Sequence, residues 1–226
     1  QQERLRALGL LAAIADSSDD AIFAMDPQGR YTLFNPAASR FVGKPAHEVI
    51  GCNNHDLFPP DQASLLQAAE QLVVAQDRLV TQEEALSTVD GERVFLATKG
   101  PLRDSSGRIV GIFGISRDIT QIKQTEAALR RANRALLTSQ ECGQAVMRVA
   151  DEDDLLREIC RIVVHTGGYR MAWVGFAQDD ALRTVHPVTH EGVDTDYLHS
   201  LQISWGDNPQ GQGPTGAAIR ERRPMV

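Results

Sequence analysis

The sequence is short of cysteine and of long apolar runs. Its three cysteines, Cys52, Cys142 and Cys160, are scattered, and none has CxxC spacing. That pattern argues against a disulfide framework and predicts free thiols in a reducing, cytoplasmic compartment. No apolar run approaches the length of a membrane span, and no basic segment precedes an apolar core. We therefore expect no part of this chain to enter a membrane.

Charge and motifs exclude further classes of function. The net charge of −7 argues against nucleic acid or an anionic membrane surface as the main partner. The His, Cys and carboxylate residues form no cluster at metal-ligand spacing, so no metal site is predicted. No nucleophile has a base at a suitable spacing, so no catalytic residue is predicted and the chain is not expected to be an enzyme. The glycine-rich run 211–216 lacks the Gly-Lys-Ser/Thr ending of a phosphate-binding loop.

What is present is 226 residues, 42% of them apolar, which is enough for one or two globular domains. The chain begins with Gln1 rather than Met. We therefore expect it to be a piece of a longer protein.

The stretch 90–120 organises the first half of the chain. Asp90-Gly91 is a hairpin-turn dipeptide between strand-like runs, and residues 104–107 form a second turn cluster. The run 109–115 is apolar on both faces, which is typical of a central strand covered on both sides. A helix follows it directly. The pattern predicts a sheet whose last strand is tied to an outgoing helix.

Helical spacing of Leu5, Leu8, Leu11 and either Ala12 or Ile14 predicts a short amphipathic helix at the N-terminus, in residues 1–18. It could cover the open face of the sheet or pair with a second copy. The alternative is the frayed end of a linker.

Three strands and two helices come next. Residues 21–26 and 31–34 are predicted to form two strands joined by a turn. Asn35 before Pro36 is a good N-cap for the helix that follows. A longer helix is predicted from Asp61 to about residue 77, and a strand at 80–89. The helix carries an apolar stripe that should face the sheet, formed by Leu65, Leu66, Ala69, Leu72 and Val73.

Residues 19–121 resemble a PAS domain. The resemblance rests on four motifs in the right order: DAIFAMDPQGRYTLFNPAASRFVG (20–43), EVIGCNNHDLFPPDQ (48–62), the R-D-x-x-G-x-x-x-G run at 103–111, and Asp118-Ile119-Thr120. It implies an α+β PAS fold, a five-stranded antiparallel sheet with short helices on one face. It also implies a role in sensing, without naming the signal.

A pocket between helices and sheet would be the place for a small molecule, of unknown identity. Its expected lining is Phe23, Asn35, Phe41, Phe58, Leu66, Leu96, Thr98 and Ile112. The alternative for each apolar residue is a place in a filled core, and the alternative for Asn35 is helix capping.

The sequence disfavours the two cofactors that members of this family bind. The reactive cysteine of flavin-binding relatives would fall at Asn54, and Cys52 is about two residues away. The axial histidine of haem-binding relatives would fall at Leu66, and no histidine occurs between His55 and His165. We therefore predict no cofactor.

Residues 118–140 resemble the output segment of a PAS protein. Asp118 and Thr120 are expected to tie the sheet to the following helix, as a cap and a hinge. Ile122, Leu129 and Leu136 recur at seven along a linker helix at 122–140, which predicts weak parallel pairing in a homodimer. The alternative is a single helix lying on its own sheet.

Residues 141–226 resemble the first part of a GAF domain. The matching runs are CRIVVHTGGYRMAWVG (160–175) and GQGPTGAAIRERRP (211–224). The later strands and closing helix of that fold are missing, so an incomplete α+β domain is expected. PAS–GAF pairs precede histidine kinase domains of two-component systems, or cyclic-di-GMP synthase or hydrolase domains. The expected function is thus sensory input to such an output domain; the alternative is a ligand-free PAS/GAF dimerisation module.

Overall fold

The computed structural model describes residues 2–192 and 202–225. The chain divides into two compact units, residues 1–126 and 127–226. The first unit contains α1 (Gln2–Ser17), β1 (Ala21–Met25), β2 (Tyr31–Phe34), α2 (Pro36–Val42), α3 (Ala46–Val49), α4 (Asn54–Leu57), α5 (Pro60–Gln76), β3 (Val80–Thr88), β4 (Gly91–Arg103), β5 (Ile109–Asp118) and the first turns of α6 (Thr120–Arg148).

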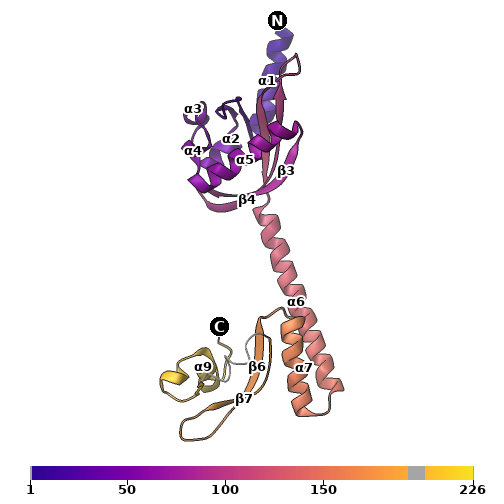
Figure 1. The fold of residues 1–226 in the computed structure, drawn as a ribbon, viewed down its shortest axis with the longest axis vertical. Coiled ribbons are helices and arrows are strands. Elements are labelled where there is room, and N and C mark those ends of the chain that lie inside the picture. Colours follow the sequence, from indigo (N-terminus) through magenta and orange to yellow (C-terminus); the bar gives the residue numbers. More distant parts are fainter. Residues whose placement is uncertain (1, 193–201, 226) are drawn as a thin grey trace. The chain divides into compact units, whose positions relative to one another are not determined.

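The five strands form one antiparallel sheet in the order β2-β1-β5-β4-β3. The last strand of the first unit, β5, is therefore the central strand of this sheet. Helices α2 to α5 gather on one face of the sheet (Figure 1). Between that face and the helices lies the hydrophobic core, built on Ala21, Met25, Tyr31, Phe34, Ala38, Val49, Val73 and Ile112.

The prediction that β5 is central is confirmed, but the prediction that both its faces are covered is wrong within this unit. Val110 and Ile115 are 38% and 39% exposed. The helices α2 to α5 cover one face alone, so apolar residues that point to the other face keep part of their surface in water.

The apolar stripe of α5 differs from the predicted one. Leu65 and Leu72 are exposed, whereas Ala63, Leu66, Ala69, Glu70 and Val73 are buried. The buried set follows a spacing of three and four residues, the period of one helix face. It includes a glutamate that the apolar pattern passed over.

The N-terminal helix α1 is present, and its residues Leu11 and Ile14 are exposed. Leu5 and Leu8 belong to the predicted stripe, but their side chains lie outside the described part of the chain. The backbone of α1 is tied to the core through Ala15, whose carbonyl accepts a hydrogen bond from Asn35 Nδ2 at 2.8 Å.

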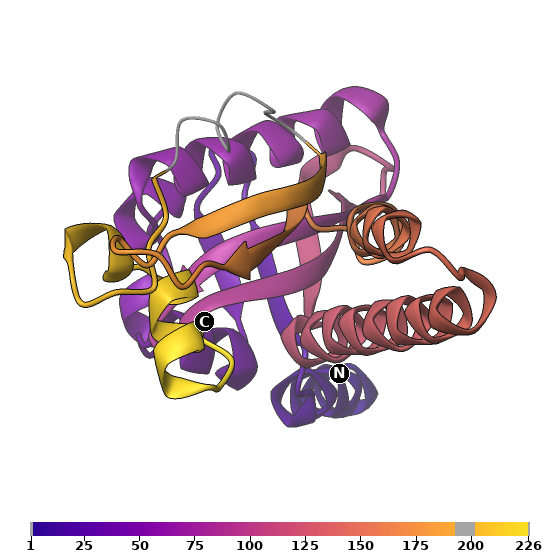
Figure 2. The same ribbon diagram turned by 90° about the horizontal axis from the view of Figure 1, so that it is seen from below.

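The helix α6 is longer than predicted and runs without a break to Arg148. It continues through Gly143, a residue that lowers helix stability but does not end this helix. The second unit continues with α7 (Glu152–His165), β6 (Met171–Ala177), β7 (Val185–Gly192), the short 3₁₀ helix η1 (Pro209–Gly211) and α9 (Pro214–Glu221). The helices α7 and α9 lie on opposite sides of the β6–β7 hairpin (Figure 2).

Candidate functional site

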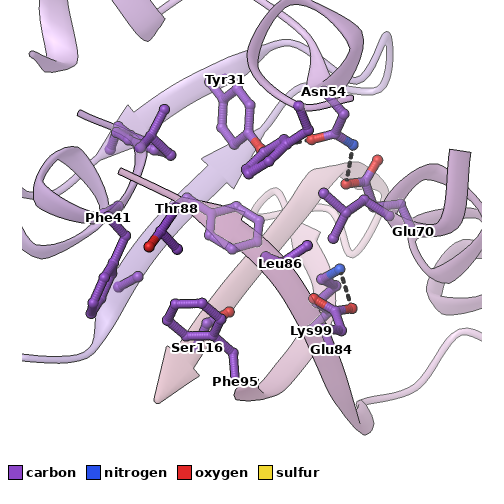
Figure 3. Close-up of a pocket in the computed structure, with 17 residues that line it drawn as sticks. Tyr31, Phe41, Asn54, Glu70, Glu84, Leu86, Thr88, Phe95, Lys99 and Ser116 are labelled. Atoms are coloured by element: carbon purple, nitrogen blue, oxygen red, sulfur yellow. Dashed lines mark hydrogen bonds and ion pairs between the residues drawn. The ribbon is translucent and has the colours of Figure 1, made fainter. Parts of the chain in front are cut away.

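The first unit has a partly open cavity of about 50 Å³ between the sheet and its helices. Figure 3 shows the side chains around it, aromatic at one end and charged at the other. The cavity is lined by Ala21, Phe23, Tyr31, Phe34, Ala38, Phe41, Val42, Asn54, Phe58, Leu66, Glu70, Glu84, Leu86, Thr88, Phe95, Lys99 and Ser116. Its volume has room for about four water-sized groups.

Four of the predicted pocket residues line this cavity: Phe23, Phe41, Phe58 and Leu66. The Phe23 ring crosses the central strand at Gly114, its partner in the β1–β5 register. A Cβ at Gly114 would collide with that ring, so the glycine makes the crossing possible.

Two predicted residues of β4 lie on the wrong face. Leu96 is 39% exposed, and the Thr98 hydroxyl bonds to the Thr81 hydroxyl at 2.9 Å in an exposed pair. The residues of β4 that face the helices are Phe95, Ala97 and Lys99. Side chains alternate along a strand, so an error of one residue in the register moves the whole set to the other face.

The other two predicted residues have structural positions. Ile112 is buried in the core and lines an open groove of about 480 Å³ outside the cavity. Asn35 is 2% exposed, and its Oδ1 accepts hydrogen bonds from the backbone N–H groups of Ala38 and Ile22, both at 2.9 Å. Asn35 therefore caps α2 and ties it to β1 and α1, the alternative role weighed for it from the sequence.

A chain of buried hydrogen bonds crosses the charged end of the cavity. The Tyr31 hydroxyl donates to Asn54 Oδ1, and Asn54 Nδ2 donates to Glu70 Oε1, both at 2.7 Å. Burial raises the pKa of the Tyr31 hydroxyl, and the charges of Glu70 and Glu84 add to that effect. Tyr31 therefore stays protonated and acts as the donor.

Glu70 is a buried carboxyl with competing neighbours. Burial raises its pKa above the ordinary range for glutamate, and Glu84 adds to the rise. The hydrogen bond from Asn54 and the positive charge of Lys99 act in the opposite direction. The net effect is a raised pKa, so the protonated form of Glu70 is favoured more here than it would be in water.

Lys99 and Glu84 form a buried ion pair on neighbouring strands. Lys99 Nζ lies 2.6 Å from Glu84 Oε1, and both residues are less than a tenth exposed. Gln82 Nε2 also donates to Glu84 Oε1, at 3.0 Å. A buried charge must be paired to be tolerated, so this pair sets the side-chain positions at the charged end.

The predicted hinge residues lie together where β5 passes into α6. Asp118 Oδ1 accepts a hydrogen bond from the Thr120 backbone N–H at 2.8 Å, and Asp118 Oδ2 lies 2.6 Å from an Arg93 guanidinium nitrogen. The Thr120 hydroxyl oxygen accepts from the Val94 backbone N–H at 2.9 Å. Both side chains therefore tie the start of α6 to β4.

The electrostatics of Asp118 follow from these contacts. Burial alone would raise the pKa of Asp118, but the hydrogen bonds from Thr120 and the Arg93 guanidinium together hold it below its usual range. Asp118 is therefore ionised, and its bond to Arg93 is charge-assisted.

Arg93 joins the hinge to the cavity. Its guanidinium carbon lies 5.8 Å from the centre of the Phe41 ring. That ring packs edge-on against Phe95 with centroids 4.9 Å apart, and both rings line the cavity. Phe41 is thus a cavity residue in contact with Arg93, the partner of Asp118.

Sequence reasoning missed the charged end of the cavity: Tyr31, Asn54, Glu70, Glu84 and Lys99. Two signals could have found part of it. Lys99 follows Phe95 and Ala97 on the same face of a strand, and Glu70 sits four residues after Leu66 on the buried face of α5. A charged residue inside an apolar repeat indicates either a buried pair or a site.

Two features are absent from the described part of the chain. Within residues 2–192 and 202–225, no group of three or more His, Cys, Asp or Glu side chains could hold a metal ion. No helix of that part of the chain is long and apolar enough to cross a membrane.

The sequence profile of the PAS fold matches residues 15–124. Those residues form a PAS domain. The match extends a few residues beyond the predicted 19–121 and takes in the end of α1 and the start of α6. The PAS domain is a sensory module of signal-transduction proteins, as the relatives of this chain show.

One relative is the methanogenesis regulatory histidine kinase FilI of Methanothrix harundinacea, 30% identical over 150 residues, or 66% of this chain and 17% of the kinase. A diguanylate cyclase of Vibrio cholerae is 32% identical over 111 residues, or 48% of this chain and 35% of the cyclase. The chain thus spans about a third or less of the length of these relatives. A solved PAS domain from Colwellia psychrerythraea is 25% identical, with a TM-score of 0.46 over 51% of this chain and 98% of that domain.

Proposed function

We propose that this PAS domain is the sensory input module of a cytoplasmic signal-transduction protein, and that it relays the state of a bound ligand or partner through α6. The observation that carries the proposal is the continuous set of contacts from the cavity to the helix. Phe41 lines the cavity, Arg93 lies over Phe41, and Asp118 binds Arg93.

The relay needs two arrangements of one element. A ligand that displaces Phe41 shifts Arg93, and the Arg93–Asp118 bond then changes the position of the first turn of α6. The bond from the Val94 N–H to Thr120 and the bond from the Ile119 N–H to the Val94 carbonyl, both 2.9 Å, define the unshifted arrangement. A change in these bonds is passed along the helix.

The output domain is proposed from the relatives. Their names give two kinds of enzyme, a regulatory histidine kinase and a diguanylate cyclase. We propose further that residues 141–226 are the first part of a GAF domain between sensor and output. A helix, α7, followed by an antiparallel hairpin, β6–β7, supports that assignment.

The relay is tested in the full-length protein by removing one hinge hydroxyl. We expect Thr120→Ala to change the basal output activity severalfold, because the Val94 N–H loses its acceptor, at a cost of about 1 kcal/mol in stability. Thr125→Ala is the matched control, since its hydroxyl bonds within α6, to the Gln121 carbonyl at 2.8 Å. Unchanged output in a folded Thr120→Ala protein would refute the relay.

A homodimer through α6 and α1 is part of the proposal. Ile122, Leu129 and Leu136 are spaced seven residues apart along α6. Their side chains are 62%, 68% and 70% exposed, as expected for an apolar seam without a partner. We expect Leu129→Asp combined with Leu136→Asp to convert the dimer to a monomer in sedimentation equilibrium. A ligand-free dimerisation module remains the second candidate, favoured by the small volume of the cavity.

A further inference from the structure

Three charged side chains from three elements converge at one end of the cavity. Glu70 comes from α5, Glu84 from β3 and Lys99 from β4, and each is less than a tenth exposed (Figure 3). A charged residue is rarely buried to this extent unless it is paired. The three form an odd set, with two carboxyl groups for one ammonium group.

The hydrogen bonds show which carboxyl group is in excess. Lys99 pairs with Glu84 Oε1, which also accepts from Gln82, whereas no ion pair among the described residues reaches Glu70. Glu70 Oε1 accepts from Asn54, and no hydrogen bond within the described residues reaches Glu70 Oε2. Every fully buried side-chain N or O atom in that part of the chain has a partner. Glu70 Oε2 therefore has accessible surface, either to the cavity or to the groove that Glu70 also lines.

We propose that the cavity selects a compact ligand that presents a nitrogen-bound proton to Glu70, such as a small amine or a ring N–H cation, and rejects carboxylates. This deepens the proposed sensory function and rests on it. The aromatic end, with Phe41 and Phe95, takes the apolar or ring part of the ligand. The volume of about 50 Å³ limits the ligand to a few heavy atoms.

Charge balance is the physical reason. When Glu70 is ionised the charged end carries one net negative charge, which is costly in a buried place. A ligand cation restores neutrality and forms a charge-assisted bond with the carboxylate. A ligand carboxylate would meet two carboxyl groups and an ammonium group that is already paired.

Binding should depend on pH through Glu70. The groups that face it are the Tyr31 hydroxyl from β2, Asn54 from α4, Glu84 from β3 and Lys99 from β4. Protonated Glu70 offers the ligand no negative charge. The affinity for a cation should therefore rise as the pH increases through the pKa of Glu70 and become constant above it.

The test uses the whole 226-residue chain and three probes of similar size: imidazole, furan and propionate. Binding is followed by the methyl NMR signals of Leu66 and Leu86, which line the cavity. We expect imidazole to shift both signals in a saturable way. Furan should bind about tenfold more weakly, and propionate should not bind at the same concentrations.

Two matched variants locate the selectivity. Glu70→Gln keeps an acceptor for Asn54 and removes the charge. We therefore expect it to weaken imidazole binding about tenfold, so that imidazole and furan bind with the same affinity. Glu83→Gln removes the neighbouring charge on β3, where Glu83 pairs with Lys123 instead of facing the cavity. It should leave both affinities unchanged.

The outcomes separate the two proposals. Propionate binding as tightly as imidazole, or a Glu70→Gln chain with unchanged preference, overturns the ligand class and leaves a ligand-sensing cavity standing. No response to any probe overturns both the ligand class and the ligand arm of the proposed function. The ligand-free dimerisation module would then be favoured.

Discussion

The two faces of the PAS sheet are built from the same strands and do different things. On β4, Phe95 and Lys99 are 2% exposed on the face toward the helices, whereas Leu96 is 39% exposed on the other face. On β3, Glu84 pairs with Lys99 inside and its neighbour Glu83 pairs with Lys123 outside. One residue of shift along a strand thus separates a buried ionic site from an ordinary surface.

The inner and outer ion pairs differ in how strongly water and salt screen their charges. The outer pair, Glu83–Lys123, has side chains 52% and 39% exposed, so water and salt screen it. The inner pair is screened much less, and a new charge in the cavity must be accommodated by its neighbours. We therefore propose that a ligand is sensed on the inner face and that the outer face is available for contacts with other surfaces.

The largest expected effect comes from breaking each ion pair in turn. Lys99→Met leaves Glu84 buried without its partner, which should lower the free energy of unfolding of the PAS domain by about 3–5 kcal/mol. Lys123→Met breaks the outer pair and should cost about 0–1 kcal/mol. Urea denaturation followed by amide hydrogen exchange in β4 and β5 measures both. Equal costs would mean that the faces do not differ.

Removing the charge of Glu70 is expected to raise the stability of the domain, by a smaller amount than Lys99→Met lowers it. Burial raises its pKa, so its contribution to stability is full below the pKa of an exposed glutamate and is lost as the pH rises through the folded-state pKa. Glu70→Gln should therefore make the domain more stable than the parent at neutral pH, on the order of 1 kcal/mol. The gain should shrink as the pH falls toward 4.

Thermal unfolding at several pH values measures the difference between Glu70→Gln and the parent. Glu83→Gln is the control, because it removes a partly exposed carboxylate from the outer face. A Glu70→Gln protein that loses stability at neutral pH would show that Glu70 is stabilised as an anion.

The smallest effect is expected on the outer face itself. Thr98→Val removes the exposed hydroxyl bond to Thr81 but keeps a β-branched side chain, so stability should change by about 0.5 kcal/mol or less. Chemical denaturation at two protein concentrations measures it. A cost above about 1 kcal/mol that appears at the higher concentration alone would show that a second copy covers this face.

Much of this could be predicted from residue order. Turn dipeptides, the Asn35 cap and the apolar run of β5 located the elements and the central strand, because these signals depend on neighbours in the chain. The lining residues Phe41 and Leu66 on helices, and Phe58 just after α4, were also found. The register of β4 was misplaced by one residue, and the charged end of the cavity was missed.

The sequence by itself determined the order of elements, the central place of β5 and the direct passage from sheet to α6. The tertiary structure alone decided that Glu70, Glu84 and Lys99, from one helix and two strands, share one end of a cavity. It also decided that Glu83 and Glu84 have opposite surroundings. Propensity and capping are local, whereas the burial of a charge depends on what other elements bring to it.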